Sequence, residues 1–161
     1  MKKEIRFCLP VGEYWFLSPH SEIPIEMQVD GKTYKFPSAE HYYQAMKFET
    51  TDSRFNDILN IKDSDEARLT TKKPEYKSNR RPDFDKNKFD IMREAQIAKF
   101  SQNPNARELL LSTGDAVLIK SCDACHKCGF GEGSGKNMLG RILMDIRDKL
   151  QKNADMPLPP L

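Results

Sequence analysis

The sequence predicts a mainly helical α+β protein: a single compact, multi-helical domain over residues 1–150 with a few short strands. Apolar residues recur at helical spacing in several segments after residue 38. Proline and glycine interrupt the first 35 residues, where short strands and loops fit, and residues 116–120 are apolar enough for one more strand. A chain of 161 residues is long enough to bury a core, and residues 151–161 are expected to form a flexible tail.

The composition excludes several classes of protein. Hydrophobic residues make up 38% and charged residues 31% of the chain, and the net charge is only +2. That charge is too small to indicate nucleic-acid or membrane-surface binding by itself. No apolar run approaches the roughly 20 residues of a membrane span, and the N-terminus lacks the apolar stretch of a signal peptide. We therefore expect a cytoplasmic protein without a membrane partner; the sequence does not indicate an oligomeric state.

The first half of the chain predicts a hairpin followed by short helices. Residues 29–36, VDGKTYKF, contain an Asp-Gly pair that is typical of a hairpin turn. Ser38 is suited to cap a helix that runs to about Phe48. Residues 52–62 and 63–69 are expected to form two further short helices.

The second half predicts a long loop and three helices. Residues 70–84, TTKKPEYKSNRRPDF, are basic and lack apolar periodicity, so we expect a long loop there. Residues 85–102 are the strongest predicted helix. An asparagine–proline pair at 103–104 starts another helix that runs to about Ser112, and a last helix follows the glycine-rich residues 128–137.

One face of the helix that starts at Ser38 has an unusual composition. Glu40, Tyr43, Gln44 and Lys47 share this face, because seven residues span about two helical turns. It holds an acid, a phenol, a carboxamide and an amine, without the further lysines and glutamates that usually fill a solvent face. From the residues alone, it is either an exposed face with weak charge pairing or part of a site.

The predicted loop ends in a second polar cluster. Arg80, Arg81, Asp83 and Phe84 could clamp a phosphate and stack on a planar ring. A solvated surface loop would have a similar composition.

Glycines alternate along CGFGEGSGKN, residues 128–137. This segment is not a Walker A loop, because Phe130 stands where the first glycine belongs and Asn137 follows Lys136 in place of serine or threonine. Free backbone N–H groups ahead of a helix would still suit a phosphate cradle. A flexible connection is the alternative.

The cysteines indicate neither a disulfide framework nor a complete metal site. Three of them fall within a short span at positions 122, 125 and 128, with His126 among them. Zinc usually takes four ligands from two separated pairs, and no second C-x-x-C is present. A fourth ligand would have to come from elsewhere in the chain: Cys8, His20 or His41. We expect reduced thiols and no metal.

Six segments together form a longer pattern. They are DGKTY at 30–34, EHYYQAMKF at 40–48, RPDF at 81–84, M-x-x-A-x-x-x-K-F-x-Q at 92–102, LLSTGD at 110–115 and GKNMLGRILMDIR at 135–147. In this order they resemble the YbiA/NADAR family, over about residues 5–150.

The resemblance implies a YbiA-like fold and N-glycosidase chemistry: hydrolysis of the C1–N bond between a phosphoribose or ADP-ribose and a base-like amine. It implies two substrate types, the ribosylamino-pyrimidine phosphates of riboflavin biosynthesis and ADP-ribose attached to a base such as guanine. The expected partner is a small nucleotide-like substrate or an ADP-ribosylated base. Nucleic acid enters only as a modified substrate, and no cofactor is expected.

The chemistry suggests roles for three catalytic residues. Breaking an N-glycosidic bond develops positive charge at C1 and requires a proton on the leaving nitrogen. Glu40 is expected to serve as the acid/base. Lys47 would either bind phosphate as a fixed cation or attack C1 and form a Schiff base with the sugar. Asp123 would orient ribose hydroxyls or water.

Further residues are expected to bind the substrate. Phe84 would stack on the base, while Arg81 and the glycine-rich loop would hold phosphate. The complete expected set is Tyr43, Gln44, Arg81, Asp83, Phe84, Gly129, Gly131 and Asn137.

The chain departs from the family pattern at three positions that affect these roles. Phe84 and Cys128 stand where the family has tryptophan. Cys125 stands where an aspartate is expected, and the nearest aspartate is Asp123. These departures leave an alternative function, a non-catalytic module of the same fold that binds ADP-ribose or a nucleotide.

Overall fold

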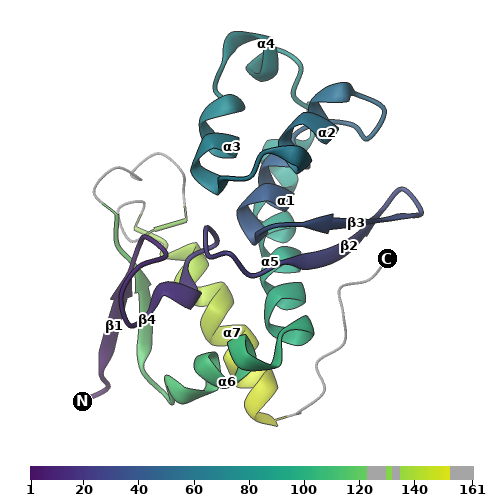
Figure 1. Ribbon diagram of the computed structural model, residues 1–161. Helices are drawn as coiled ribbons and strands as arrows, with labels where there is room; N and C mark the ends of the chain where they lie inside the picture. The colour runs from purple at the N-terminus through teal and green to yellow at the C-terminus, as the bar shows by residue number, and fades with distance from the viewer. Residues whose placement is uncertain (123–129, 132–134, 153–161) are drawn as a thin grey trace. The chain divides into compact units, whose positions relative to one another are not determined.

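A computed structural model describes residues 1–122, 130–131 and 135–152 (Figure 1). Seven α-helices and four short β-strands lie within these residues, so the predicted mainly helical α+β class is confirmed. The chain divides into two compact units. We call Glu22–Lys99 the central unit, and Met1–Ser21 together with the described residues from Phe100 onward the terminal unit. The single-domain boundary at residue 150 stays a prediction.

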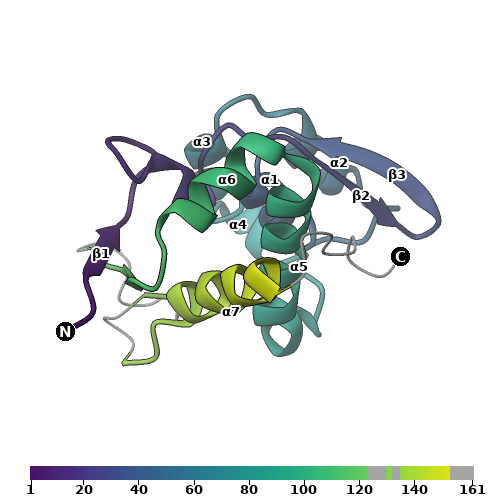
Figure 2. The same cartoon turned by 90° about the horizontal axis from the view of Figure 1, so that it is seen from below.

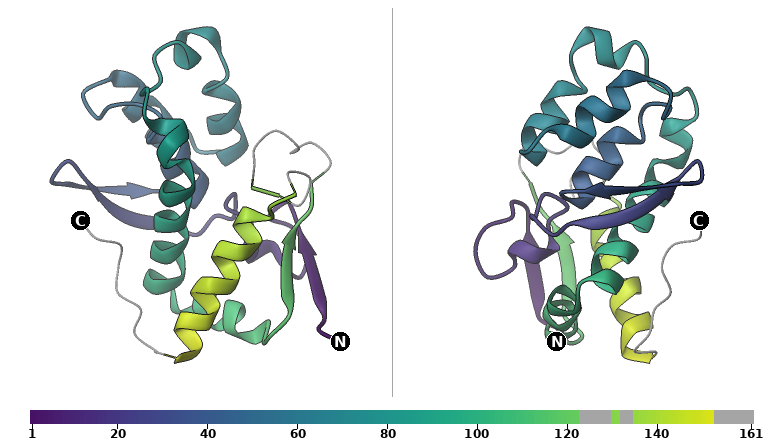
Figure 3. Two further views of the ribbon diagram at one scale, coloured as in Figure 1. Left: turned by 180° about the vertical axis from the view of Figure 1, so that it is seen from behind. Right: turned by 45° about the vertical axis from the view of Figure 1, so that its right-hand side comes forward.

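The terminal unit is built on a parallel pair of strands. Strand β1 (Glu4–Phe7) pairs with β4 (Val117–Lys120), and Glu4 lies opposite Val117. The 3-10 helix η1 (Trp15–Leu17), α6 (Pro104–Ser112) and α7 (Met138–Lys152) complete the unit. Helix α7 runs beside β4 and also contacts α6 (Figures 2 and 3). Its buried apolar stripe, as predicted from the spacing, is Leu139, Ile142, Leu143, Ile146 and Leu150.

Asn137 ties the start of α7 to strand β4. Its side-chain Oδ1 accepts a hydrogen bond from the Lys120 N–H at 3.0 Å, and its Nδ2 donates to the Leu118 carbonyl at 2.9 Å. The carboxamide therefore bonds to β4 much as a peptide group of a neighbouring strand would. Asn137 itself has a φ of 47°, a left-handed conformation that asparagine tolerates better than most residues.

Gly140 permits the close approach of α7 to β4. A Cβ at this position would overlap the Leu118 carbonyl oxygen and the Asn137 side chain. Both groups are already fixed by the hydrogen bond that joins them. The glycine is therefore required by backbone packing.

We predict that Gly140→Ala lowers the free energy of unfolding by about 1–3 kcal/mol, the usual range for overpacking. In an unobstructed helix the same change would raise it by about 1 kcal/mol, so the sign of the effect tests the contact. Urea unfolding followed by circular dichroism would measure it. Arg141→Ala, at the exposed neighbouring position, should change stability by less than about 0.5 kcal/mol. A stabilised Gly140→Ala variant would contradict the packing argument.

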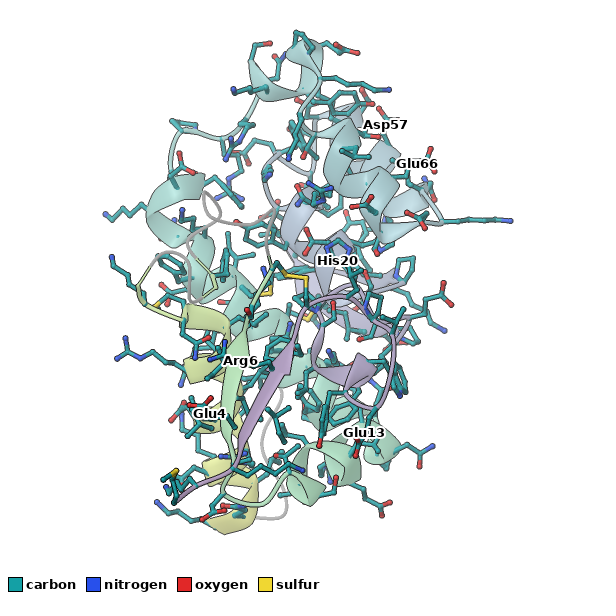
Figure 4. All side chains as sticks on the ribbon, turned by 90° about the vertical axis from the view of Figure 1, so that its left-hand side faces the viewer. Glu4, Arg6, Glu13, His20, Asp57 and Glu66 are labelled. Atoms are coloured by element: carbon teal, nitrogen blue, oxygen red, sulfur yellow. A yellow bond between two sulfur atoms is a disulfide. The ribbon has the colours of Figure 1, made fainter. Side chains whose placement is uncertain are left out.

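A disulfide joins Cys8 to Cys122 in the terminal unit (Figure 4). The expectation of reduced thiols is therefore wrong for these two residues. Both follow the strands β1 and β4, whose parallel pairing brings their C-terminal ends together and leaves the two Cα atoms 5.3 Å apart. In this state Cys8 and Cys122 cannot serve as zinc thiolates. Cys125, His126 and Cys128 lie outside the described residues.

We predict that reduction of this disulfide destabilises the protein. The cross-link joins residues 114 positions apart, and loops of that length are stabilised by about 4–5 kcal/mol in the chain-entropy model. The urea midpoint should therefore fall when reductant is added. A Cys8→Ser/Cys122→Ser variant serves as the control, since its midpoint should match that of the reduced protein. Equal midpoints for the oxidised protein and this variant would refute a stabilising cross-link.

The central unit begins with the predicted hairpin. Strand β2 (Ile25–Val29) pairs antiparallel with β3 (Lys32–Phe36). Asp30 and Gly31 both have positive φ, as a two-residue hairpin turn requires. Phe36 packs against Tyr42 and Phe55 with ring centroids 5.3 and 6.1 Å away. These aromatic contacts join the hairpin to the helices that follow.

Five helices make up the rest of the central unit. They are α1 (Ala39–Ala45), α2 (Ser53–Asn60), α3 (Ser64–Thr70), α4 (Pro74–Lys77) and α5 (Phe84–Gln102), whose last three residues belong to the terminal unit. Helices α2 and α3 both contact α1 (Figure 3). No helix in the described part of the chain is long and apolar enough to cross a membrane.

Two elements differ from the prediction. Helix α1 ends at Ala45, before the expected end near Phe48, because the chain tightens into turns in which Lys47 N donates to Gln44 O and Phe48 N to Ala45 O. The predicted loop at 70–84 contains α4, which starts with Pro74 in its first turn, a position where proline needs no hydrogen-bond partner. The segment is therefore more ordered than its composition indicated.

Candidate active site

The polar face of α1 is buried in the central unit. The side chains of Glu40 and Gln44 belong to residues that are 6% and 3% exposed, and Tyr43 and Lys47 are half-buried. Gln44 Nε2 donates to Glu40 Oε1 at 2.6 Å, an i,i+4 pair along the helix. The face is thus not a solvated stripe of charges. A buried carboxylate needs hydrogen-bond donors, and Gln44 supplies one.

Thr71 extends this pair into a chain that reaches Lys47. Its Oγ1 donates to Gln44 Oε1 at 2.8 Å and accepts from Lys47 Nζ at 3.4 Å. The four side chains therefore run Lys47–Thr71–Gln44–Glu40. Thr71 follows α3 within the basic segment, and nothing in the sequence pattern singled it out.

His41 holds the start of α1 in place beside Glu40. Its Nε2 lies 2.7 Å from the Ile61 carbonyl oxygen, and its Nδ1 lies 2.7 Å from Ser38 Oγ. A carbonyl only accepts, so Nε2 carries the proton that it donates. Ser38 Oγ also accepts from the His41 backbone N–H at 3.2 Å, which caps the helix. These bonds hold the first turn of α1, which carries Glu40.

Two aromatic rings flank the amine of Lys47. Its Nζ lies 5.7 Å from the centroid of Tyr43 and 5.6 Å from that of Phe84. The two rings meet edge to face, with centroids 5.2 Å apart. Burial raises the pKa of Tyr43 well above its usual range, so its phenol stays protonated at neutral pH.

The electrostatic surroundings make Lys47 a weaker base than an ordinary lysine. Burial lowers the pKa of Lys47 from 10.5 to about 8, and the positive charges of Arg80 and Lys72 act in the same direction. Glu40 and Asp85 partly oppose the shift. A lysine with this pKa is neutral for a useful fraction of the time near pH 7.4.

Phe84 is a packing residue in this structure. It is 2% exposed, and the guanidinium carbon of Arg80 lies 5.2 Å from its ring centroid. Arg80 Nη2 also donates to Asp85 Oδ1 at 3.3 Å. The ring is thus within cation–π distance of both Arg80 and Lys47. Its expected stacking on a base stays a prediction.

Arg81 and Asp83 form a pair that fixes the end of the basic segment. Arg81 Nε and Nη2 donate to the two carboxylate oxygens of Asp83 at 3.2 and 3.1 Å, and Glu49 lies 3.5 Å from Nε. These bonds lower the pKa of Asp83. The Arg81 backbone N–H also donates to the Lys47 carbonyl at 2.7 Å. The segment is thereby joined directly to the backbone of Lys47.

The remaining predicted residues lie in the terminal unit or outside the described residues. Gly131 and Asn137 lie in the terminal unit, where the Asn137 carboxamide bonds to strand β4. Asp123 and Gly129 lie outside the described residues. The central unit therefore brings Glu40 and Lys47 together with Tyr43, Gln44 and Phe84. Arg81 meets Lys47 through its backbone, while its side chain pairs with Asp83 and Glu49.

Comparison with models of known protein families shows which family the chain belongs to. Residues 7–151 match the model of the NADAR domain. The chain belongs to the NADAR family. The resemblance read from the sequence segments is therefore confirmed.

Similar proteins support the fold and indicate a chemistry. The chain is 36% identical to a riboflavin biosynthesis protein of Vibrio vulnificus (strain YJ016), over 96% of the chain but only 40% of that protein. It is 34% identical to N-glycosidase YbiA of Escherichia coli (strain K12), over 91% of the chain and 88% of that protein. The NMR structure of E. coli YbiA matches with a TM-score of 0.78 and 31% identity, covering 96% of this chain and 88% of that one. The expected enzyme class agrees with the name of YbiA.

We predict that Arg80→Gln raises the pKa of Lys47, because it removes a positive charge that disfavours the ammonium form. The pH dependence of reductive methylation of Lys47, followed by peptide mass spectrometry, would measure the change. Lys77→Gln removes the same charge from α4 and serves as the control, since Lys77 is not among the groups that shift Lys47. An unchanged pKa in Arg80→Gln would contradict the electrostatic account.

Proposed function

We propose that this NADAR protein is an N-glycosidase that hydrolyses the C1–N bond between a phosphoribose or ADP-ribose and a base-like amine. The observation that carries the proposal is the half-buried Lys47, whose pKa is about 8. The side chains of Thr71 and Gln44 connect it by hydrogen bonds to the buried Glu40. The name of E. coli YbiA, an N-glycosidase, supports this chemistry, and the name of the Vibrio relative, a riboflavin biosynthesis protein, supports a substrate from riboflavin biosynthesis.

The pKa of Lys47 favours its role as a nucleophile. At pH 7.4 a lysine with a pKa of about 8 is neutral for about a fifth of the time, whereas an ordinary lysine is neutral for about a thousandth. Only the neutral amine has the electron pair that attacks C1. A lysine that served purely as a phosphate anchor would gain from a raised pKa instead.

The proposed reaction uses one water and returns both side chains to their starting state. Neutral Lys47 Nζ attacks C1, and the C1–N bond breaks with its electron pair on the leaving base. Glu40 takes a proton from Nζ and delivers it to that nitrogen. The sugar ring then opens to a Schiff base on Lys47 as the remaining Nζ proton passes to the ring oxygen. Water hydrolyses the C1=N bond, which releases the sugar and restores the neutral amine of Lys47. Asp123 would orient ribose hydroxyls or this water.

The charges around Lys47 favour an anionic substrate. Arg80 and Lys72 both act on Lys47 as positive charges, and Arg80 is partly exposed. Arg80 has one hydrogen bond to Asp85, whereas two hydrogen bonds join Arg81 to Asp83. We therefore propose Arg80 and Lys72 as the first contacts of the substrate phosphate, with Arg81 as a further contact.

We predict that Lys47→Ala and Glu40→Gln each lower turnover by at least about a hundredfold, the size expected for loss of a nucleophile or an acid/base. The substrates to compare are ADP-ribosylated guanosine and a ribosylamino-pyrimidine phosphate, with products separated by chromatography. Lys47→Arg keeps the charge but cannot form a Schiff base, so it should be as inactive as Lys47→Ala. Lys77→Arg, on exposed α4, should retain activity.

Borohydride should trap a sugar adduct on Lys47 during turnover, detected by peptide mass spectrometry. An active Lys47→Arg variant without an adduct would reject the nucleophile and leave Lys47 as a fixed cation. Wild-type turnover in Glu40→Gln would reject its acid/base role. No release from either substrate would reject the proposed glycosidase for these two classes.

A binding module is the second candidate, favoured by Phe84 and Cys128 standing where the family has tryptophan. In that case the same residues would bind ADP-ribose or a nucleotide without cleaving it. Calorimetry alongside the chromatographic assay would separate the two functions. Binding without release of the base would support the module.

A further inference from the structure

Thr71 occupies the position between the proposed nucleophile and the proposed acid/base. It is 2% exposed and forms the C-terminal cap of α3, whereas Glu40, Gln44 and Lys47 come from α1 and the turn after it. Its Oγ1 is the acceptor for Lys47 Nζ and a donor toward Gln44 Oε1. One hydroxyl therefore connects groups from two separate helices.

The Glu40 carboxylate determines which way the Gln44 carboxamide faces. A carboxylate only accepts, so Nε2 points at Glu40 Oε1, 2.6 Å away, and Oε1 lies 2.8 Å from the Thr71 hydroxyl. The hydroxyl matches this orientation when it donates to Oε1. Glu40 and Thr71 thus hold the Gln44 carboxamide from its two ends.

The hydroxyl has one proton and two acceptors within reach. Besides Gln44 Oε1, the Arg68 carbonyl lies 2.9 Å from Thr71 Oγ1. Either choice leaves the oxygen lone pairs toward Lys47, so the ammonium form of Lys47 always finds an acceptor there. The contact therefore favours protonated Lys47 and opposes the effect of burial.

We propose that Thr71 is a positioning residue that couples Lys47 to the Gln44–Glu40 pair, holding the amine and the carboxylate in one hydrogen-bonded arrangement for the reaction. The proposal rests on the proposed function for its catalytic part. Its structural part, the bond from Lys47 to Thr71, can be tested without substrate.

A purely local role for Thr71 makes different predictions. Threonine at a helix end often bonds back to the carbonyl three residues earlier, as Thr71 does with Arg68. Thr113 makes the same local bond at the end of α6, where its Oγ1 donates to the Leu110 carbonyl at 2.6 Å, and it also accepts from Arg147 Nη1 at 2.9 Å, in the terminal unit. Loss of such a bond would affect the helix end and leave Lys47 unchanged.

The test compares Thr71→Val, which removes the hydroxyl at nearly constant volume, with Thr71→Ser, which retains it. We expect Thr71→Val to lower the pKa of Lys47, because the ammonium loses an acceptor, and Thr71→Ser to restore it. The other charges that act on Lys47 are Glu40 on α1, Lys72 after α3, Arg80 before α5 and Asp85 in the first turn of α5, and none is altered. The pH dependence of reductive methylation of Lys47 in substrate-free protein measures the shift.

Turnover provides the second readout. We expect kcat to fall by about tenfold or more in Thr71→Val with KM nearly unchanged, and to recover in Thr71→Ser, since the hydroxyl orients reacting groups without touching the substrate. Thr113→Val is the matched control and should leave both the Lys47 pKa and kcat at wild-type values. Urea unfolding establishes that each variant is folded, and Thr71→Ala replaces Thr71→Val if the valine does not fit.

The outcomes separate this inference from the proposed function. A lowered Lys47 pKa in a protein that cleaves neither substrate would support the coupling and reject the glycosidase. Normal kcat and an unchanged Lys47 pKa in folded Thr71→Val would overturn the inference while leaving the glycosidase intact. Loss of kcat that Thr71→Ser does not rescue would also overturn it, because the hydroxyl would then not be the cause.

Discussion

Burial of the Glu40 carboxylate is the constraint on which the central unit depends. A carboxylate removed from water must receive hydrogen bonds or it destabilises the fold. Gln44 provides a donor one turn along α1, and the opposite end of its carboxamide then requires a donor of its own. Thr71 supplies that donor from α3, so a single buried charge links two helices through their side chains. Lys47 completes the arrangement with a positive charge beside the same hydroxyl.

The position of Lys47 follows from how α1 ends. The helix stops at Ala45, and the tighter turns after it place Lys47 outside regular helical geometry. The backbone bond from Arg81 to the Lys47 carbonyl then joins the basic segment to this turn. That bond brings Phe84 and Arg80 to the amine, where the ring excludes water and the guanidinium opposes protonation. Burial and the nearby positive charges lower the pKa of Lys47, and the backbone geometry places the residue among the groups responsible.

In the terminal unit, residues that belong to the NADAR sequence pattern have a packing role. Asn137 bonds to the edge of β4, and Gly140 allows α7 to approach that strand closely. The same strand pairing aligns Cys8 with Cys122, which a disulfide joins. Part of the G-x-N-x-L-G pattern therefore has a structural explanation that requires no ligand.

The sequence alone determined the fold class, the hairpin at Asp30-Gly31, most helix positions and the family. These depend on local turn chemistry, on apolar spacing and on long matched segments, all of which are readable along the chain. It also drew attention to Glu40 and Lys47 as a pair, although the helix expected to join them ends at Ala45 and Lys47 lies in the turns that follow.

Only the tertiary structure decided what surrounds that face. Thr71 lies 24 residues beyond Lys47 and reaches it through helix packing, and Cys8 meets Cys122 through parallel strand pairing across 114 residues. Neither contact leaves a periodic or compositional signal, because both depend on where distant backbone segments meet. The pKa of Lys47 likewise depends on burial and on charges from other segments, so its chemistry emerges only in the folded protein.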